Sequence, residues 1–264
     1  MPELPEVEAA RRSLLRTVAG KTIARVIVRR PTVLRTHSGP GFARALRGRT
    51  IRGITRQGKA LRFSVDPWVL VFHYMLWGVV RFQRDGAAPG LGTGVFFGFA
   101  GGATLEFREL QLSTFHLLKT TRAAEAAEPG LDPLGRGLTV ETFLAALGGR
   151  GSLKDALCNQ ARIAGIGNLW AHEILFRARL RPDRTVQSLS PSEARRLYRT
   201  IRRTLRAAVA AGGEPGFHDA LGREGRARLA VYGRAGERCG GCGGTVRDGR
   251  FHGRPTFFCP RCQR

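Results

Sequence analysis

Four of the five cysteines form two Cys-x-x-Cys pairs near the end of the chain. Cys239 and Cys242 make the first pair, Cys259 and Cys262 make the second, and sixteen residues separate the two. Two such pairs bring four thiolates around a Zn²⁺ ion, and a hairpin between them closes the site. Because four protein ligands leave no coordination position for an activated water, the pattern predicts one structural zinc per chain. A redox-active Cys-x-x-Cys pair is the alternative.

Basic residues far outnumber acidic ones. Lys and Arg number 44 against 20 Asp and Glu, which gives a formal charge of +24. Such a surplus repels itself in a compact chain, so it indicates a polyanionic partner, and nucleic acid is the best candidate. A genome that favours arginine codons is the alternative, although it explains the scarcity of acidic residues less well. The hairpin expected between the cysteine pairs carries three arginines, Arg247, Arg250 and Arg254, and it can present one of them to DNA.

The chain lacks the sequence features of membrane and secreted proteins. No stretch approaches the roughly 20 apolar residues of a membrane span, and Pro2-Glu3 is unlike a basic, apolar leader. We therefore expect a soluble, cytoplasmic protein that associates with the nucleoid. Cys158 lies in a helical apolar pattern and is expected to be a buried thiol without a catalytic role.

The chain begins Met1-Pro2-Glu3. Removal of Met1 would turn the Pro2 nitrogen from an amide into a secondary amine whose pKa lies nearer neutrality than that of a lysine. Such an amine can attack an aldehyde-like sugar carbon and form an iminium ion. The alternative for a second-position proline is an ordinary flexible chain end.

Strand patterns dominate from residue 22 to about residue 118. The clearest cover residues 23–28, 61–65, 69–72 and 78–82, with Gly and Pro between them. This spacing predicts a β-sandwich or barrel. A helix is expected before it, over residues 5–18, with an apolar stripe of Val7, Leu14, Leu15 and Val18.

Helical periodicity follows a segment rich in Pro, Gly and Ala at residues 125–137. Four helices are expected, over residues 139–147, 153–159, 168–177 and 191–211. Ser190, Pro191 and Glu193 form a capping box that fixes the start of the last helix. The arginines of that helix at positions 195, 199, 202 and 206 share one face, which is either a solvated surface or a DNA contact.

Together these features resemble the formamidopyrimidine-DNA glycosylase and endonuclease VIII family over essentially the whole chain. The resemblance implies a multi-domain α+β fold, with an N-terminal β-sandwich and its leading helix, a helix-two-turn-helix domain and a C-terminal zinc-finger hairpin. We expect a catalytic domain over residues 1–124, a linker over 125–137, the helix-two-turn-helix domain over 138–230 and the zinc finger over 231–264.

The resemblance also assigns the chemistry. It implies Pro2 as the nucleophile at the sugar C1′ and Glu3 as the acid/base that helps to open the deoxyribose ring. Glu6 matches the second acidic position of the family's Pro-Glu-x-Pro-Glu start. Lys59 resembles the lysine that holds backbone phosphate near the lesion, and Arg254 resembles the zinc-finger arginine that grips phosphates around the extruded nucleotide. No soluble cofactor is implied.

Two further segments resemble the family's DNA contacts. The run Gly165-Ile166-Gly167-Asn168 resembles the helix-two-turn-helix signature, in which a tight glycine turn brings a helix N-terminus and the Asn168 side chain to phosphate. Lys154 lies in the helix before this turn and is expected among the DNA contacts. A turn that only links two helices is the alternative.

The run His73-Tyr74-Met75-Leu76-Trp77-Gly78 resembles the endonuclease VIII pattern His-Asn-Gln-Leu-Tyr-Gly, in which three successive side chains fill the gap left by a flipped nucleotide. Met75, Leu76 and Trp77 are the candidates, His73 lies beside them, and core packing is the alternative. The purine-preferring branch fills the gap from an Asp-Pro-Arg-Arg-Phe-Gly loop, but residues 108–113 here read Arg-Glu-Leu-Gln-Leu-Ser. The start Pro-Glu-Leu-Pro-Glu is nevertheless closer to the purine-preferring branch.

The expected function is that of a monomeric, bifunctional DNA glycosylase and abasic-site (AP) lyase of base excision repair. Such an enzyme flips a damaged nucleotide out of DNA, displaces an oxidised base and cuts the strand by β- and δ-elimination. Oxidised pyrimidines are the favoured substrates. A purine-preferring glycosylase, a glycosylase for bulky or crosslinked lesions, and a non-catalytic sensor of damaged DNA are the alternatives.

Overall fold

The computed structural model describes residues 1–122, 130–135, 137–148, 151–251 and 253–264. These residues divide into two compact units. The first comprises Met1–Ala127 with Pro215–Arg226, and the second comprises Glu128–Glu214 with Ala227–Arg264. Among the described residues, no helix is long and apolar enough to cross a membrane.

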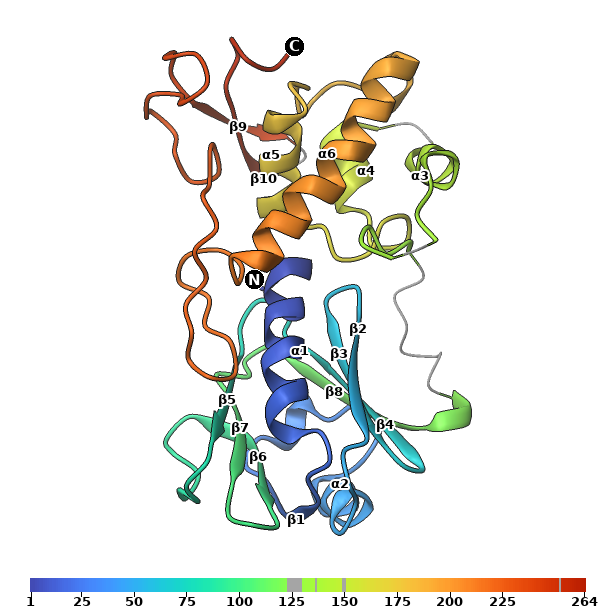
Figure 1. Ribbon diagram of the computed structural model, residues 1–264, viewed down its shortest axis with the longest axis vertical. Coiled ribbons are helices and arrows are strands. Elements are labelled where there is room, and N and C mark those ends of the chain that lie inside the picture. The colour runs from blue at the N-terminus through green and yellow to red at the C-terminus, as the bar shows by residue number, and fades with distance from the viewer. Residues whose placement is uncertain (123–129, 136, 149–150, 252) are drawn as a thin grey trace. The chain divides into compact units, whose positions relative to one another are not determined.

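The first unit is a β-sandwich preceded by helix α1 (Leu4–Val18) (Figure 1). One antiparallel sheet has the order β1 (Ile23–Val28), β6 (Thr93–Phe99), β7 (Thr104–Arg108) and β5 (Val79–Gln83). The other has the order β2 (Gly53–Gln57), β3 (Ala60–Val65), β4 (Trp68–His73) and β8 (Thr114–Lys119). Helix α2 (Gly39–Leu46) and a short 3-10 turn (Pro31–Val33) follow β1.

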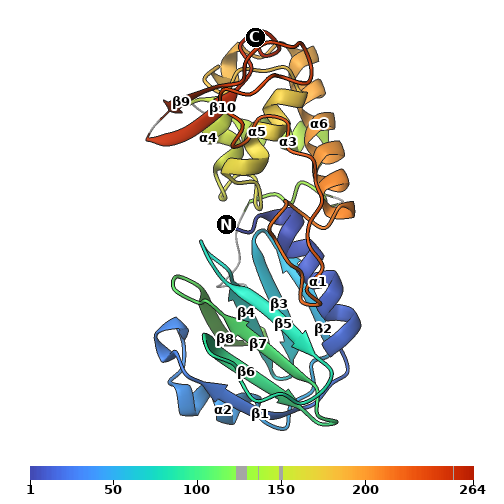
Figure 2. The same cartoon turned by 90° about the vertical axis from the view of Figure 1, so that its left-hand side faces the viewer.

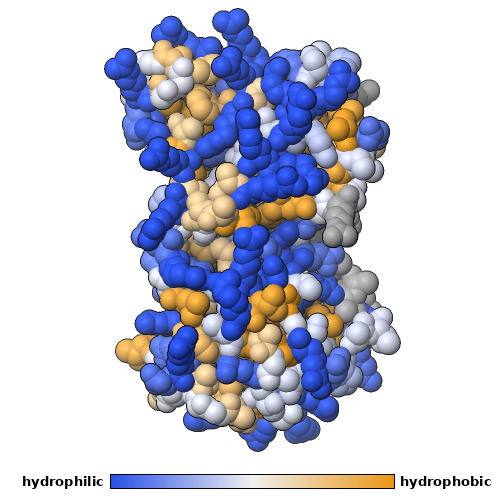
Figure 3. All heavy atoms as spheres, in the orientation of Figure 1, coloured by the Kyte–Doolittle hydropathy of each residue, from blue (hydrophilic) through white to orange (hydrophobic). Residues whose placement is uncertain are grey.

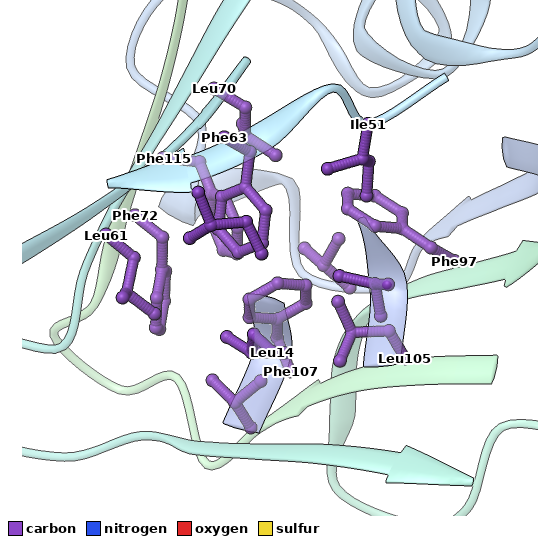
Figure 4. Close-up of a cluster of buried hydrophobic side chains, with 14 of the residues drawn as sticks. Leu14, Ile51, Leu61, Phe63, Leu70, Phe72, Phe97, Leu105, Phe107 and Phe115 are labelled. Carbon is purple, nitrogen blue, oxygen red and sulfur yellow. The ribbon is translucent and has the colours of Figure 1, made fainter. Parts of the chain in front are cut away.

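Aromatic side chains from both sheets fill the space between them (Figure 4). Phe107 is central, because its ring centroid lies 4.9 Å from that of Phe72, 5.0 Å from that of Phe115 and 5.5 Å from that of Phe97. These rings come from strands β4, β6, β7 and β8 and are fully buried. These contacts between rings of the two sheets form the core of the sandwich that the sequence predicted.

Helix α1 packs on this core through one apolar face. Val7, Leu14 and Val18 lie on that face, as predicted, and are fully buried. Leu15 was also predicted on the stripe, but its side chain is 40% exposed. The reason is the helical turn of about 100° per residue, which directs Leu15 away from the face that its neighbour Leu14 occupies.

The second unit combines four helices with a hairpin (Figure 2). The helices are α3 (Val140–Leu147), α4 (Leu153–Cys158), α5 (Asn168–Arg177) and α6 (Pro191–Ala210), with a 3-10 turn at Val186–Ser188, and the hairpin pairs β9 (Arg247–Phe251) with β10 (Arg254–Phe258). Each helix agrees with its predicted range to within one residue at either end. Ser190 caps α6, and its hydroxyl accepts a hydrogen bond from the Glu193 amide, so the predicted capping box is present.

The predicted linker over residues 125–137 lies partly outside the described residues, at positions 125–129 and 136. The described part of this segment packs against the second unit and does not act as a linker. Leu131 pairs with Ile163 of the second unit, and a Cβ added to Gly130 would lie 2.2 Å from the Gln160 carbonyl oxygen. Only glycine fits so close to another backbone segment, which places residue 130 inside the second unit.

Residues 215–226 differ from the prediction, which placed them in the domain spanning 138–230. They belong to the first unit. The Phe82 amide donates to the Ala220 carbonyl at 2.7 Å, and the Ala220 amide donates to the Ser13 hydroxyl of α1 at 3.2 Å. Ala220 is fully buried, so this segment returns to the sandwich to complete its core.

A buried carboxylate fixes the chain that leads to the hairpin. Glu173 of α5 is fully buried and accepts amide hydrogen bonds from Ala230, Val231 and Tyr232 at 2.8 to 3.0 Å. The Arg177 guanidinium donates to the same carboxylate. Charged acceptors with several donors form strong hydrogen bonds, so Glu173 ties residues 230–232 to α5.

We expect Glu173→Ala to lower the free energy of unfolding by about 3 kcal/mol, because it leaves three amides and a guanidinium without their hydrogen-bond acceptor. Glu237→Ala is the matched control, because Glu237 is about half-exposed and pairs with Arg234 near the surface. The control should lower the free energy of unfolding by less than about 1 kcal/mol. Denaturant unfolding of the zinc-loaded protein measures both. Equal losses in the two variants would refute the anchoring role of Glu173.

Candidate active site and nucleic-acid interface

The first turn of α1 fixes the start of the chain. Glu3 is the N-cap residue, and its amide donates to the Glu6 carboxylate at 2.9 Å. In return, the Glu3 side chain accepts a hydrogen bond from the Glu6 amide. Glu3 is 3% exposed and Glu6 is fully buried, so this capping box is shielded from water. It holds Pro2 directly before a helix N-terminus, where a chain end is normally mobile. Pro2 is buried, whereas Met1 is exposed.

The predicted lysine lies on a turn that is tied to the same helix. Lys59 connects β2 with β3 and is 5% exposed. The neighbouring Arg56 donates to the Gly58 carbonyl at 3.0 Å and pairs with the Glu8 carboxylate of α1 at 3.4 Å. Lys59 and Glu3 thus depend on one support, the helix α1.

Glu8 remains a carboxylate in this support. Burial raises its pKa, but hydrogen bonds and charges from Arg11, Arg12 and Arg56 outweigh that effect and lower the pKa below its usual value. A carboxylate with a lowered pKa stabilises the fold above its unfolded pKa, and this contribution is lost as the pH falls.

The loop between β4 and β5 carries three exposed apolar side chains. Met75 is 39% exposed, Leu76 is 49% exposed and Trp77 is 60% exposed. The alternative that these residues belong to the core is therefore wrong. Water-exposed apolar side chains in succession are typical of a surface that contacts a ligand.

The base of this loop is held firmly. The Ser113 hydroxyl lies 2.9 Å from the Tyr74 carbonyl oxygen and 2.8 Å from the Trp77 carbonyl oxygen. The Met75 amide donates to His73 Nδ1 at 2.9 Å, and Met75 adopts the left-handed conformation with φ of 55°. Gly78 closes the loop with φ of 133°, where a Cβ would lie 2.9 Å from the Ser113 hydroxyl. The loop thus presents apolar tips on a braced backbone.

The segment that braces this loop lies between β7 and β8. Leu110 is buried and Ser113 makes the hydrogen bonds described above, so this segment supports the neighbouring loop. No motif in the sequence marked Ser113, because a single serine carries no periodic or spacing signal.

The four predicted zinc ligands converge. Their sulfur atoms all lie within 4.8 Å of one another, at 3.8 Å between Cys239 and Cys262 and 3.5 Å between Cys242 and Cys259. A tetrahedral site with Zn–S bonds of about 2.3 Å requires sulfur separations of about 3.8 Å, so the cluster fits one zinc ion. The close contacts join cysteines of different Cys-x-x-Cys pairs, as a shared metal site requires, which favours zinc over a redox-active pair. The zinc prediction is confirmed.

Lys154 differs from its predicted role as a DNA contact. Its side chain is 2% exposed, and its ammonium donates to the Pro255 carbonyl at 2.8 Å and to the Thr256 hydroxyl at 2.5 Å. Burial lowers the pKa of Lys154. Because its ammonium is occupied beneath β10, Lys154 positions the strand that begins with the exposed Arg254.

A buried imidazole lies close to this contact. His172 of α5 forms a cluster with the rings of Tyr232 and Phe257, at 5.6 and 5.7 Å between centroids, and those two rings lie 5.4 Å apart. Burial, together with the charge of Lys154, lowers its pKa to about 3. His172 is therefore neutral at physiological pH and fills the hairpin core, a role that the sequence did not signal.

The predicted Gly-Ile-Gly-Asn turn ends at the N-terminus of α5. Gly165 has φ of 95°, Gly167 is the N-cap residue and Asn168 is the first helical residue. Gln160 braces the turn, since its side-chain oxygen accepts from the Gly165 amide at 2.8 Å and its nitrogen donates to the Ile166 carbonyl at 2.6 Å. A ten-residue helix thus presents its positive end and Asn168 together.

Three family models match the chain. The formamidopyrimidine-DNA glycosylase N-terminal domain matches residues 1–113, the H2TH domain of the same enzymes matches residues 130–217, and a zinc finger found in FPG and IleRS matches residues 236–264. The formamidopyrimidine-DNA glycosylase of Heliobacterium modesticaldum is 39% identical over all of both chains. That of Laribacter hongkongensis is 38% identical, also over all of both chains.

The chain belongs to the formamidopyrimidine-DNA glycosylase family. Solved structures agree: Lactococcus lactis Fpg bound to DNA containing N7-benzyl-Fapy-dG has a TM-score of 0.92 and 30% identity over all of both chains. The same protein with DNA containing an oxidised pyrimidine gives a TM-score of 0.91 at 30% identity over all of both chains. The predicted fold class and enzyme class, a DNA glycosylase with AP lyase activity, are those of this family and are confirmed.

We expect Cys239→Ser to release about one zinc per chain and to unfold the hairpin, because four-thiolate sites contribute folding energy outright. Cys158→Ser is the matched control, since Cys158 is the cysteine outside the cluster. Metal analysis and amide hydrogen exchange over residues 247–258 measure the two effects. Full zinc content in the Cys239 variant, or none in the unaltered protein, would refute the assignment.

Proposed function

We propose that this chain is a bifunctional DNA glycosylase and AP lyase of base excision repair that acts through Pro2. The observation that carries the proposal is the buried capping box of Glu3 and Glu6, which holds the chain start in one place. A nucleophile at a chain end needs such a support, because a reacting group must be held close to its productive geometry.

The reaction begins when removal of Met1 frees the Pro2 amine. The Pro2 nitrogen attacks the deoxyribose C1′, the bond between C1′ and the base breaks, and the base leaves with a proton. Glu3 donates the proton that opens the sugar ring and gives the iminium ion. The iminium makes the C2′ hydrogens acidic, so the 3′ phosphate and then the 5′ phosphate are eliminated. Water finally hydrolyses the iminium and releases Pro2.

The remaining predicted residues hold the DNA. Lys59, Asn168 and Arg254 contact backbone phosphates, with the helix dipole of α5 adding to the Asn168 contact. Damaged duplex DNA is the partner, and a single chain carries every group that the reaction uses. The structures of Lactococcus lactis Fpg in complex with DNA support this assignment.

We also propose that oxidised pyrimidines are preferred. The support is the exposed loop of Met75, Leu76 and Trp77, which offers three apolar side chains from a single braced segment. A preference for oxidised purines is the second candidate, because the relatives are named formamidopyrimidine-DNA glycosylase and the chain starts Pro-Glu-Leu-Pro-Glu.

Borohydride trapping against a panel of oligonucleotides tests both statements. The panel contains an oxidised pyrimidine, 8-oxoguanine, a formamidopyrimidine and a preformed abasic site, each in duplex and in single-stranded DNA. We expect borohydride to trap the protein on every substrate that it cuts. Among these substrates, the oxidised pyrimidine should give the highest single-turnover rate. Faster excision of the purines would establish the second candidate, and the absence of trapping with every substrate would refute the enzyme mechanism.

We expect Leu76→Ala/Trp77→Ala to slow excision from duplex DNA by about tenfold, equivalent to about 1.4 kcal/mol. Extrusion of a nucleotide costs a few kcal/mol of unstacking, and an inserted side chain recovers part of that energy. Cutting at an abasic site in a single strand should be unchanged, because there is no stack to enter. Single-turnover kinetics on both substrates measures the effect.

Leu91→Ala is the matched control, because Leu91 is 91% exposed on another loop of the same unit. It should leave both rates unchanged. Thermal unfolding should show little change in either variant, since all three side chains are exposed. Equal losses on duplex and single-stranded substrates would rule out the insertion role.

A further inference from the structure

Helix α6 presents a row of arginines on its outer face. Arg195, Arg199, Arg203 and Arg206 are exposed, and we name these four residues the α6 arginine face. Arg206 follows Arg195 by eleven positions, a rise of about 16 Å along the helix. Figure 3 shows hydrophilic side chains along the path that α6 takes in Figure 1.

The composition of this face differs from the sequence prediction at one position. Arg202 was predicted on the stripe, but it is half-buried, donates to the Leu138 carbonyl at 3.1 Å and lies over the Tyr198 ring at 5.8 Å. Arg203 takes its place, because it follows Arg199 by four residues and shares its face.

The four arginines have no intramolecular partner in the part of the chain that the structure describes. The acidic residue of α6, Glu193, is engaged by Arg184 at 2.7 Å. Like charges spaced four residues apart destabilise a helix, so the face is unfavourable in the free protein. A polyanion that binds there removes this repulsion.

The face is distinct from the proposed lesion contacts of the second unit. Leu197, Ile201 and Leu205 on the opposite side of α6 are fully buried, and α6 packs against α5. The arginines therefore point away from α5, which begins at Asn168. In Figure 2, α5 lies between α6 and the hairpin of β9 and β10, and it contacts both.

The surface between the arginines is hollowed. One hollow is lined by Tyr198 with Arg199, Arg202, Arg203 and Arg206, and an adjoining hollow is lined by Arg196, Arg199, Thr200 and Arg203. Guanidinium groups bind phosphate through paired hydrogen bonds, so these hollows suit phosphate groups. Duplex DNA carries a charge about every 1.7 Å, which gives roughly nine phosphates over the length of the face.

We propose that the α6 arginine face binds the backbone of a second, undamaged DNA duplex while the lesion site holds its own substrate. Its use would be transfer between DNA segments during the search for damage, since backbone contacts are independent of sequence. The inference rests on the proposed function only for the duplex that fills the lesion site.

The test uses protein covalently trapped by borohydride on a short lesion duplex. A labelled, undamaged duplex is titrated into this complex over a range of salt concentrations. We expect binding, and we expect Arg199→Gln/Arg203→Gln to reduce the slope of log affinity against log salt by about 1.8, the loss of two phosphate contacts. Excision from a short duplex should remain unchanged in this variant.

Arg44→Gln/Arg47→Gln is the matched control, because it removes the same charge from two exposed arginines of the first unit. An equal reduction of the salt slope in the control would show that net charge alone accounts for the binding, and it would overturn the proposal. A trapped complex that binds no second duplex would also overturn the proposal. Displacement of the second duplex by polyglutamate at equal charge concentration would overturn it too, because that result would indicate an acidic protein partner. If trapping fails, the proposed function fails, and the same titration with free protein and both variants still decides the role of the face.

Discussion

The hydrogen bond from the Glu3 amide to the buried Glu6 carboxylate is the contact on which the proposed chemistry depends. The first residues of most chains are mobile, so catalysis by a terminal amine requires that this end be fixed. The capping box does so at a helix N-terminus, and α1 is held in turn by its apolar face and by the pair between Glu8 and Arg56. The position of Pro2 is thereby coupled to the sandwich core.

A similar arrangement recurs at the other positions that we propose to contact DNA, where polar contacts fix the backbone that carries the side chain. Ser113 braces the loop of Met75 to Trp77, Lys154 supports the strand that starts at Arg254, and Gln160 holds the turn before Asn168. Each support removes conformational freedom before DNA binds, which lowers the entropic cost of forming the complex. The zinc ion serves the hairpin in the same way.

Sequence reasoning succeeded where a pattern is local. The cysteine spacing predicted the zinc cluster, and helix and strand periodicity together with the Ser190 cap predicted most elements. It failed where a contact joins distant segments. Residues 215–226 return to the first unit through Ala220, and Lys154 turns toward the hairpin about 100 residues away. Such contacts follow from packing in three dimensions and leave no periodic signal in the chain.

The most direct test of the central claim is to locate the atom that joins the protein to DNA. After borohydride reduction of the complex with a lesion duplex, proteolysis and mass spectrometry identify the modified residue. We expect the sugar remnant to be attached to an N-terminal peptide that begins at Pro2, with Met1 absent. A remnant on the side chain of Lys59 or any other lysine, with an unmodified Pro2, would contradict the central claim.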